Sequence, residues 1–362
     1  MDSSTSQALE RRWYTLAAMD ILLSRAGGTG APRYAARAAV VEQLWDSAPF
    51  SASAEGVPEL RGPLTPAAFA AASGGYRRPV VLRGFGAETA AVQRWTPAHL
   101  AERLGSAPSV VVEMDDAARN GDAHASRRIL HEMPFDRFVA RMRDEALYLH
   151  NATGFASQLP ELVDELDLPR IQAQLAGDAS GWDGLFSSNL FVGGEKVYSN
   201  LHCAPGGNFF LQIHGAKTWT LVDPALSPYL APVPSRPFNH CLSAFGSYRL
   251  HRDAPDCPLH RLPRSVVRLE PGDVLYNPPW WWHEVENHGD TIGCAIRHVP
   301  PPLAASPTWR NHRLFSALSV YPKLWAFSAV SWARHRLLGS SRPMRAFLNP
   351  RLAAELNRAR GR

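Results

Sequence analysis

The chain has 362 residues and a mass of 39.8 kDa, enough for one large domain with extensions or at most two domains. Hydrophobic residues make up 45% and charged residues 20%, as in a folded soluble protein, while 30 prolines and 26 glycines argue against a helical bundle. The net charge of +5 is uneven, because residues 301–362 hold eleven Lys or Arg and one acidic residue, which leaves −5 for the remainder.

The chain shows no sign of export or of a membrane anchor. Its first residues lack the basic and apolar regions of a secretory leader. No run of 18 apolar residues is present, so we expect no membrane span. The four cysteines lack CxxC spacing, which favours a reducing compartment over a disulfide framework. Together these features predict a cytoplasmic location.

The first 150 residues alternate helices with isolated strands. Residues 8–48 have apolar side chains at helical spacing, interrupted by glycines at 27–30 and followed by a linker over 50–65. Thr96 as N-cap and Pro97 at the first helical position predict the start of another helix. The other expected elements of this region are strands over 78–84, 109–113 and 147–149 and a helix over 134–142.

From residue 185 onward, short strands follow one another closely. They are separated by Gly, Pro or Asp turns and are expected at 190–192, 208–212, 218–222, 265–269, 273–276 and 291–297. This pattern is typical of a double-sheet jelly roll or a small barrel. After the prolines at 300–302 the apolar spacing becomes helical again. We therefore divide the chain into an N-terminal helical extension with its linker (1–60), a β domain (61–300) and a basic C-terminal helical region (301–362).

Three features of the β domain indicate a metal site. His202 lies just ahead of a strand-like run, and on an extended chain Ala204 would lie on the same side as His202. Residues 270–282 read as a tight turn, a strand and a proline-aromatic turn, and His283 follows them. Lys217 comes fifteen residues after His202, on the next strand, so its ammonium could enter the same cavity.

This constellation resembles the JmjC/cupin-like iron(II)- and 2-oxoglutarate-dependent oxygenases, particularly the asparaginyl hydroxylase that inhibits the hypoxia-inducible factor. The resemblance runs from about residue 78 to residue 299 and rests on several blocks in the same order. The blocks are Trp95 to Leu100, Tyr148-Leu149, Asn208 to Ile213, Gly215-Ala216-Lys217, Gly272 to Tyr276 and Trp281-Trp282-His283. The resemblance implies a mainly β double-stranded β-helix, a cupin jelly roll, with helical extensions at both ends.

The resemblance also implies roles for individual residues. His202 and His283 match the two iron-ligating histidines. Lys217 matches the lysine that pairs with the distal carboxylate of 2-oxoglutarate, with Tyr148 and Ser199 as hydrogen-bonding partners at that end. These residue types suit the chemistry, because neutral imidazoles bind iron(II) and a dianion needs a buried cation with hydroxyl donors.

Two further polar residues belong to the expected cosubstrate site. Asn208 is similar to the asparagine near the metal-chelating end of 2-oxoglutarate. Arg297 lies on the strand after His283, near the place of a site-facing polar residue in relatives. It could bind a carboxylate of the cosubstrate or of an anionic substrate, and an ion-paired structural arginine is the equal alternative.

The sequence departs from the family at Ala204, where the usual His-x-Asp or His-x-Glu motif supplies a carboxylate. The aliphatic iron(II)/2-oxoglutarate halogenases have the same His-x-Ala or His-x-Gly motif, and in them chloride takes the vacated place. A methyl group leaves room for the halide, whereas a carboxylate would exclude it by volume and by charge. The leading interpretation is therefore a halogenase that chlorinates an unactivated C–H bond of an amino acid, a peptide or a related small molecule.

Two alternatives stay open. One is a hydroxylase of a protein or peptide side chain, with a replacement third ligand supplied by Cys203, Glu195 or Glu284. On an extended chain, however, Cys203 would point away from His202. The other alternative is a non-catalytic cupin-like binding protein, in which Ala204 reflects loss of the metal site.

For the substrate and the partners, the sequence indicates only broad classes. The resemblance allows a small-molecule, carrier-bound or peptide substrate, and we expect no nucleic-acid partner. The basic region over 301–362 could form a homodimer interface or bind an acidic carrier domain, although packing on its own domain is the simplest role.

Overall fold

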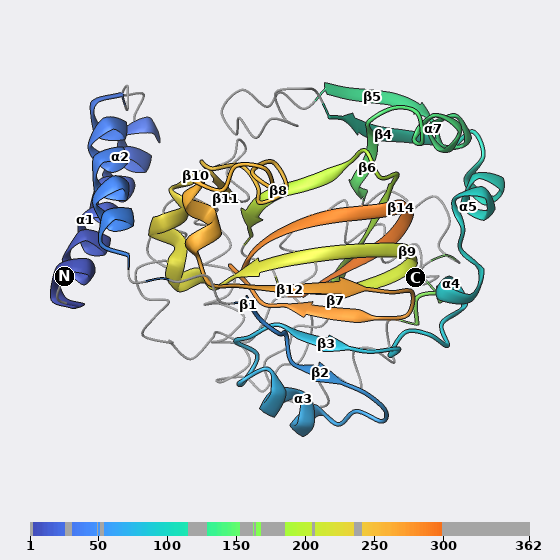
Figure 1. Ribbon diagram of the computed structural model, residues 1–362. Helices are drawn as coiled ribbons and strands as arrows, with labels where there is room; N and C mark the ends of the chain where they lie inside the picture. Colours follow the sequence, from blue (N-terminus) through green and yellow to red (C-terminus); the bar gives the residue numbers. More distant parts are fainter. Residues whose placement is uncertain are drawn as a thin grey trace, which may run out of the picture.

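The computed structural model describes residues 3–25, 31–48, 50, 54–114, 129–152, 162, 164–167, 185–204, 207–234 and 241–298. In this part of the chain fourteen strands join into one hydrogen-bonded sheet with helices around it (Figure 1), which confirms the predicted mainly β fold. The strands are β1 (Ala54–Glu55), β2 (Glu59–Leu60), β3 (Val80–Leu82), β4 (Pro108–Glu113), β5 (Ile129–Pro134), β6 (Leu147–Ala152), β7 (Leu185–Gly193), β8 (Tyr198–Cys203), β9 (Gly207–Val222), β10 (Pro232–Pro234), β11 (Cys241–Ser243), β12 (Arg264–Leu269), β13 (Val274–Asn277) and β14 (Trp282–His298). The helices are α1 (Ser3–Arg25), α2 (Ala31–Asp46), α3 (Pro66–Ala72), α4 (Ala90–Arg94), α5 (Pro97–Leu104) and α7 (Phe135–Arg141), with the 3-10 helices η1 (Pro224–Leu230) and η2 (Pro258–Arg261).

Helices α1 and α2 form a pair at the left of Figure 1 and contact η1. The predicted interruption at the glycine run separates the two helices. Trp13 of α1 and Leu44 of α2 are fully buried in the core that they share with the strands. Trp45 donates its indole N–H to the carbonyl oxygen of Tyr229 in η1 at 3.2 Å. The N-terminal helices therefore pack directly on the β domain.

Strands β9 and β14 are antiparallel partners over almost their whole length and form the central strand pair of the jelly roll. Both bend at the same place: Gly215 has a φ of 64° in β9, and the register of β14 shifts between His288 and Ile292. On one side of the bend, residues 216–222 of β9 pair with β12 and residues 282–288 of β14 pair with β8. On the other side, residues 208–211 of β9 pair with β13 and residues 291–298 of β14 pair with β7. The bend therefore creates two layers from one pair of strands.

Alternating residues of β9 pack into two separate hydrophobic cores. Phe210 faces the interior between the two layers, where its ring lies 4.9 Å from that of Trp219 on the other half of the same strand. Phe209 and Leu211 face outward and pack with residues of the surrounding helices, such as Phe69 of α3. This period of two is the one expected of a strand that is covered on both sides.

The N-terminal cap of α5 is as predicted. Thr96 is the N-cap residue, and its hydroxyl accepts the backbone N–H of His99 at 3.1 Å, with Pro97 at the first helical position. A side-chain oxygen at this position satisfies one of the free N–H groups at the start of a helix.

Several predicted elements need correction. The two strands expected at 208–212 and 218–222 are one bent strand, β9, because Gly215 bends the chain without ending its pairing. Strand β14 begins at Trp282 rather than at residue 291, and His202 lies inside β8 rather than ahead of a strand. Strands β5, β10 and β11 had no counterpart among the expected elements, and β1 and β2 lie in the segment expected to be a linker, 50–65. The expected C-terminal helical region, 301–362, lies outside the described residues.

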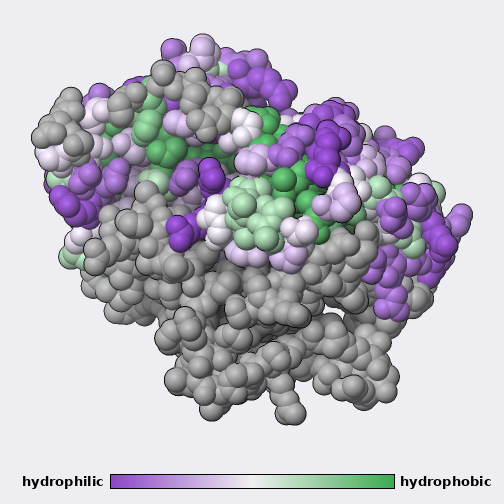
Figure 2. All heavy atoms as spheres, turned by 90° about the horizontal axis from the view of Figure 1, so that it is seen from below, coloured by the Kyte–Doolittle hydropathy of each residue, from purple (hydrophilic) through white to green (hydrophobic). Residues whose placement is uncertain are grey.

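Figure 2 shows the molecule from below, where hydrophobic residues gather in a band across the middle of the described surface between hydrophilic groups. Among the described helices, none has both the length and the apolar character needed to cross a lipid bilayer. The domain boundaries and the cytoplasmic location stay predictions.

Replacing Gly215 with alanine should destabilise the fold. A Cβ at this position would lie 2.1 Å from the carbonyl oxygen of Asp290, and the backbone already has a positive φ. We expect Gly215→Ala to lower the free energy of unfolding by more than about 2 kcal/mol in chemical denaturation. Gly56→Ala is the matched control, because no atom lies within 4 Å of a Cβ there. Equal stability of both variants would contradict the role of Gly215 as the bend.

Candidate active site

The two predicted metal ligands, His202 and His283, are brought side by side by strand pairing. They are cross-strand partners in β8 and β14, and their ring centroids are 4.1 Å apart. Trp280, which has a positive φ of 67°, lies in the turn before β14. Its backbone N–H donates to the carbonyl oxygen of Ala204 at 2.8 Å. The turn before His283 is therefore tied to the end of the strand that carries His202.

Both imidazoles are oriented through their Nδ1 atoms. Nδ1 of His202 lies 2.7 Å from the carbonyl oxygen of Asn200, and Nδ1 of His283 lies 2.9 Å from that of Trp281. A ring that donates its Nδ1–H to a carbonyl keeps the Nε2 lone pair available as a metal ligand. Trp219 stacks on His283 with ring centroids 5.3 Å apart, which fixes the plane of that ring. The pair therefore fits two of the ligands that a ferrous ion requires.

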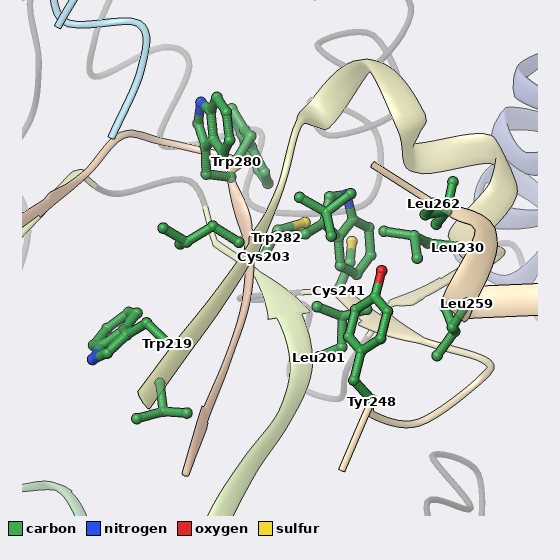
Figure 3. Packing of buried hydrophobic residues seen from close by; sticks show 14 of the residues in the cluster. Leu201, Cys203, Trp219, Leu230, Cys241, Tyr248, Leu259, Leu262, Trp280 and Trp282 are labelled. Atoms are coloured by element: carbon green, nitrogen blue, oxygen red, sulfur yellow. The ribbon is translucent and has the colours of Figure 1, made fainter. Parts of the chain in front are cut away.

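The described residues do not supply a third ligand. No group of three His, Cys, Asp or Glu side chains able to hold a metal occurs in the part of the chain described. Cys203 points away from His202, as expected, and forms a hydrogen bond with Cys241 in the packed cluster of Figure 3. Ala204 thus leaves the carboxylate position unfilled by any of the candidates described here.

The two glutamates considered as replacement ligands are both directed elsewhere. Glu284 is buried, but its carboxylate accepts the backbone N–H groups of Tyr248 at 2.6 Å and Arg249 at 3.3 Å. Glu195 lies exposed in the turn between β7 and β8. The hydroxylase alternative therefore cannot draw its third ligand from Cys203, Glu195 or Glu284 in this structure.

Lys217 lies at the bend of β9 and β14, fully buried. Its ammonium donates to Asn287 Oδ1 at 2.5 Å and to Thr291 Oγ1 at 2.9 Å, both on β14. Burial lowers the pKa of Lys217 from its usual 10.5 to about 7, and no acidic side chain contributes to this shift. Among the described residues this cation therefore has hydrogen-bond partners but no counter-ion.

Tyr148 and Ser199 lie near Lys217, in the interior between the two layers of the jelly roll (the chamber). The Tyr148 ring centroid is 5.7 Å from Nζ of Lys217, and its hydroxyl forms a hydrogen bond with Ser199 on β8. Burial raises the pKa of Tyr148, so its hydroxyl stays protonated and can donate a hydrogen bond at neutral pH. The predicted set around Lys217 is thus brought together, and it fits a small carboxylate.

Asn287 and Thr291 are two site residues that were not predicted from the sequence. Asn287 is the cross-strand partner of Lys217, and its side-chain N–H donates to the carbonyl oxygen of Gly194 at 3.0 Å. Thr291 donates to the carbonyl oxygen of Gly193 at 3.2 Å. Thr291 stands at the start of the last expected strand, 291–297, and Asn287 lies outside it, so the role of both depends on the register of β9 on β14.

A row of polar residues runs across β13, β9 and β14 in the layer opposite the histidines, near the histidine pair. Asn277 of β13, Asn208 of β9 and Arg297 of β14 are neighbours in register. The side-chain amide of Asn277 lies 3.2 Å from Nδ1 of His283. Asn208 is buried, and its side-chain oxygen has no hydrogen-bond partner among the described residues. The chamber therefore has one cation at its bend and polar groups at its histidine end.

Removing the buried charge at Lys217 should stabilise the protein without ligand. The fall in pKa from 10.5 to about 7 corresponds to roughly 5 kcal/mol of destabilisation, from which the lost hydrogen bonds must be subtracted. We expect Lys217→Met to raise the thermal unfolding temperature below pH 7, where Lys217 is charged in both the folded and the unfolded protein.

The advantage of Lys217→Met should shrink as the pH rises from 7 towards 10.5, because the folded protein then carries Lys217 uncharged. Lys196→Met is the control, since Lys196 is exposed. A Lys217→Met variant that is less stable than the wild type at pH 6 would contradict the absence of a counter-ion.

Comparisons with known proteins agree with this architecture. The chain is 27% identical over 254 residues to tRNA wybutosine-synthesizing protein 5 of Gallus gallus, a match that covers 62% of this chain and 72% of the relative. It is 26% identical over 216 residues to lysine-specific demethylase 8 of Xenopus tropicalis, covering 58% of this chain and 45% of the relative. Residues 66–298, well over half of the chain, match the family described as "Cupin-like domain". The chain belongs to this family of cupin-like domains.

Proposed function

We propose that the protein is an iron(II)- and 2-oxoglutarate-dependent oxygenase that hydroxylates a C–H bond. The observation that carries this proposal is the pairing of His202 and His283 at one end of a chamber whose bend holds the uncompensated cation Lys217. Membership of the cupin-like family and similarity to a protein named as a lysine-specific demethylase support the oxygenase class.

The fit to 2-oxoglutarate rests on charge and on donor groups. A dianion placed between Lys217 and a metal would give the buried ammonium the counter-ion that the described residues lack. Tyr148 supplies a protonated hydroxyl within the same group of residues, whereas the hydroxyl proton of Thr291 is already donated to the carbonyl oxygen of Gly193. We assign the distal carboxylate of the cosubstrate to Lys217 and the chelating end to the histidine pair, near Asn208.

The protein's own residues orient the metal-binding imidazoles and line the site. The carbonyl oxygens of Asn200 and Trp281 keep the two imidazoles in the tautomer that ligates a metal, and Trp219 fixes the plane of His283. Bound iron(II) would supply the activation of dioxygen. Phe210 and Phe191, whose ring centroids lie 5.9 Å apart on the inner face, would present an apolar surface to the bound molecules.

Chlorination is the second candidate, and Ala204 is the observation that favours it. With no His, Cys, Asp or Glu among the described residues taking the third ligand position, a halide could bind there. The comparisons give this reading less support than hydroxylation, because the names of the relatives refer to demethylation and to wybutosine synthesis. The narrower resemblance to asparaginyl hydroxylases would make a protein side chain the substrate.

Anaerobic titration tests these proposals together. Adding iron(II) and 2-oxoglutarate to the purified protein should produce the weak visible charge-transfer band of a chelated cosubstrate. His202→Ala and Lys217→Met should each lose the band, the first through the metal and the second through the dianion. Absence of a band in the wild type at every chloride concentration would leave the non-catalytic binding protein as the answer.

Restoring a carboxylate at position 204 separates hydroxylation from chlorination. For a hydroxylase, Ala204→Asp should bind iron(II) at least about tenfold more tightly, because it completes the usual ligand set, and chloride should leave the wild-type spectrum unchanged. Ala204→Asn is the control of similar shape without the charge. A wild-type band that shifts with chloride, and a shift that Ala204→Asp abolishes, would contradict hydroxylation and favour the halogenase.

Cosubstrate binding should weaken as the pH rises. Lys217 has a pKa of about 7 in the free protein, and only its charged form attracts the dianion, so binding above pH 7 requires uptake of a proton. We expect the affinity for 2-oxoglutarate to fall at least about tenfold between pH 6 and 8.5 in calorimetric titrations. Lys217→Arg, which stays charged, should lose this dependence. An unchanged wild-type affinity would remove Lys217 from the binding site.

A further inference from the structure

Arg297 stands out as a second cation on the inner face of the chamber. It is the cross-strand partner of Asn208, whose other neighbour is Asn277, next to His283. Residues two apart on a strand share a face, so Arg297 lies on the same side as Ala295, which belongs to the interior core. With neighbouring strands about 5 Å apart, Arg297 is roughly 10 Å across the layer from Asn277.

The surroundings of Arg297 contain no acid among the described residues. No ion pair or hydrogen bond of its side chain occurs there, and burial lowers its pKa to about 10 without any carboxylate opposing the shift. The side chain is nevertheless partly exposed, unlike that of Lys217. This combination argues against the structural ion-paired arginine considered from the sequence and leaves the guanidinium available to an anion from solvent.

The two cations have different positions and therefore different roles. Lys217 lies at the bend, opposite Asn287, whereas Arg297 lies ten residues further along β14 from Asn287, opposite Asn208. In the proposed function, Lys217 binds the distal carboxylate of 2-oxoglutarate and the histidine-bound metal binds its other end, so neither end needs Arg297. Because Ala204 supplies no negative charge, Arg297 then remains without a counter-ion even when iron(II) and the cosubstrate are bound.

The residues next to Arg297 indicate the kind of molecule that would supply this charge. One step deeper on the same face lie Ala295 and its partners Phe210 and Asn189, and Phe191 is packed against Phe210. Ala295, Phe210 and Phe191 together give an apolar wall on the face that carries the guanidinium. One arginine among neutral amides balances a single negative charge, which suits a carboxylate better than a phosphate dianion.

We infer that Arg297 binds a carboxylate of the substrate and so selects monoanionic molecules with an apolar group beside the carboxylate. This inference rests on the proposed function, since it takes Lys217 as the cosubstrate site. It revises the sequence-based expectation, which left Arg297 open to the cosubstrate as well. A guanidinium can hold a carboxylate through two parallel hydrogen bonds, which fixes the orientation of the substrate relative to the histidine pair.

The test compares an acid with its amide. The full-length protein is saturated with 2-oxoglutarate and titrated calorimetrically with 3-phenylpropionate or with 3-phenylpropionamide, which differ in charge and share the apolar group. We expect the wild type to bind the acid at least about tenfold more tightly than the amide. Arg297→Gln should remove this preference, and Arg297→Lys should retain part of it because it keeps the charge.

The controls separate this inference from the proposed function. Arg268→Gln removes an exposed arginine that pairs with Glu270, and it should leave the preference unchanged. The affinity for 2-oxoglutarate, measured first in each variant, should be lost in Lys217→Met and kept in Arg297→Gln. A wild type that fails to bind 2-oxoglutarate would overturn the proposed function, while its acid preference can still be measured.

Three outcomes would overturn the role of Arg297. They are equal affinity of the wild type for acid and amide, a preference that survives in Arg297→Gln, and loss of 2-oxoglutarate binding in Arg297→Gln. The last outcome would assign Arg297 to the cosubstrate. Circular dichroism of each variant confirms that it is folded, and Arg297→Lys provides the comparison if Arg297→Gln is not.

Discussion

The pairing of β9 with β14 through a shared bend is the constraint on which the rest of the structure depends. It places Lys217 opposite Asn287 at the bend, Leu221 opposite His283 in one layer and Asn208 opposite Arg297 in the other. Because side chains alternate between the faces of a strand, a slip of one residue would turn all of these groups out of the chamber. Gly215 permits the bend, since the positive φ and the close carbonyl of Asp290 leave no room for a side chain.

The chamber formed in this way is rich in cations and poor in acids. Lys217 is held by an amide and a hydroxyl, Arg297 by no acid of the described chain, and Ala204 stands where relatives of the resembled family have a carboxylate. A buried charge without a counter-ion lowers stability, so its presence in a folded site indicates a ligand of opposite charge. The same reasoning leads to the dianionic cosubstrate at Lys217 and to an anionic substrate at Arg297.

Local signals in the sequence were enough for part of this architecture. The Thr96-Pro97 pair predicted the start of α5, and the turn residues around 208–212 predicted a strand there. His202, His283, Lys217 and Tyr148 were found through the order of several motifs, and the structure brings the histidines together at one end and the other two at the bend. Asn287 and Thr291 could not be found in this way, because their role depends on register across a bend that resembles a turn in sequence.

The central claim is that one chamber holds a metal at its histidine pair and a carboxylate at Lys217. A crystal structure with manganese(II) and 2-oxoglutarate, grown without oxygen, tests it most directly. The account predicts the ion on Nε2 of His202 and His283, with the distal carboxylate of the cosubstrate within hydrogen-bond distance of Nζ of Lys217. An ion bound elsewhere, or a cosubstrate whose distal carboxylate lies away from Lys217, would contradict it.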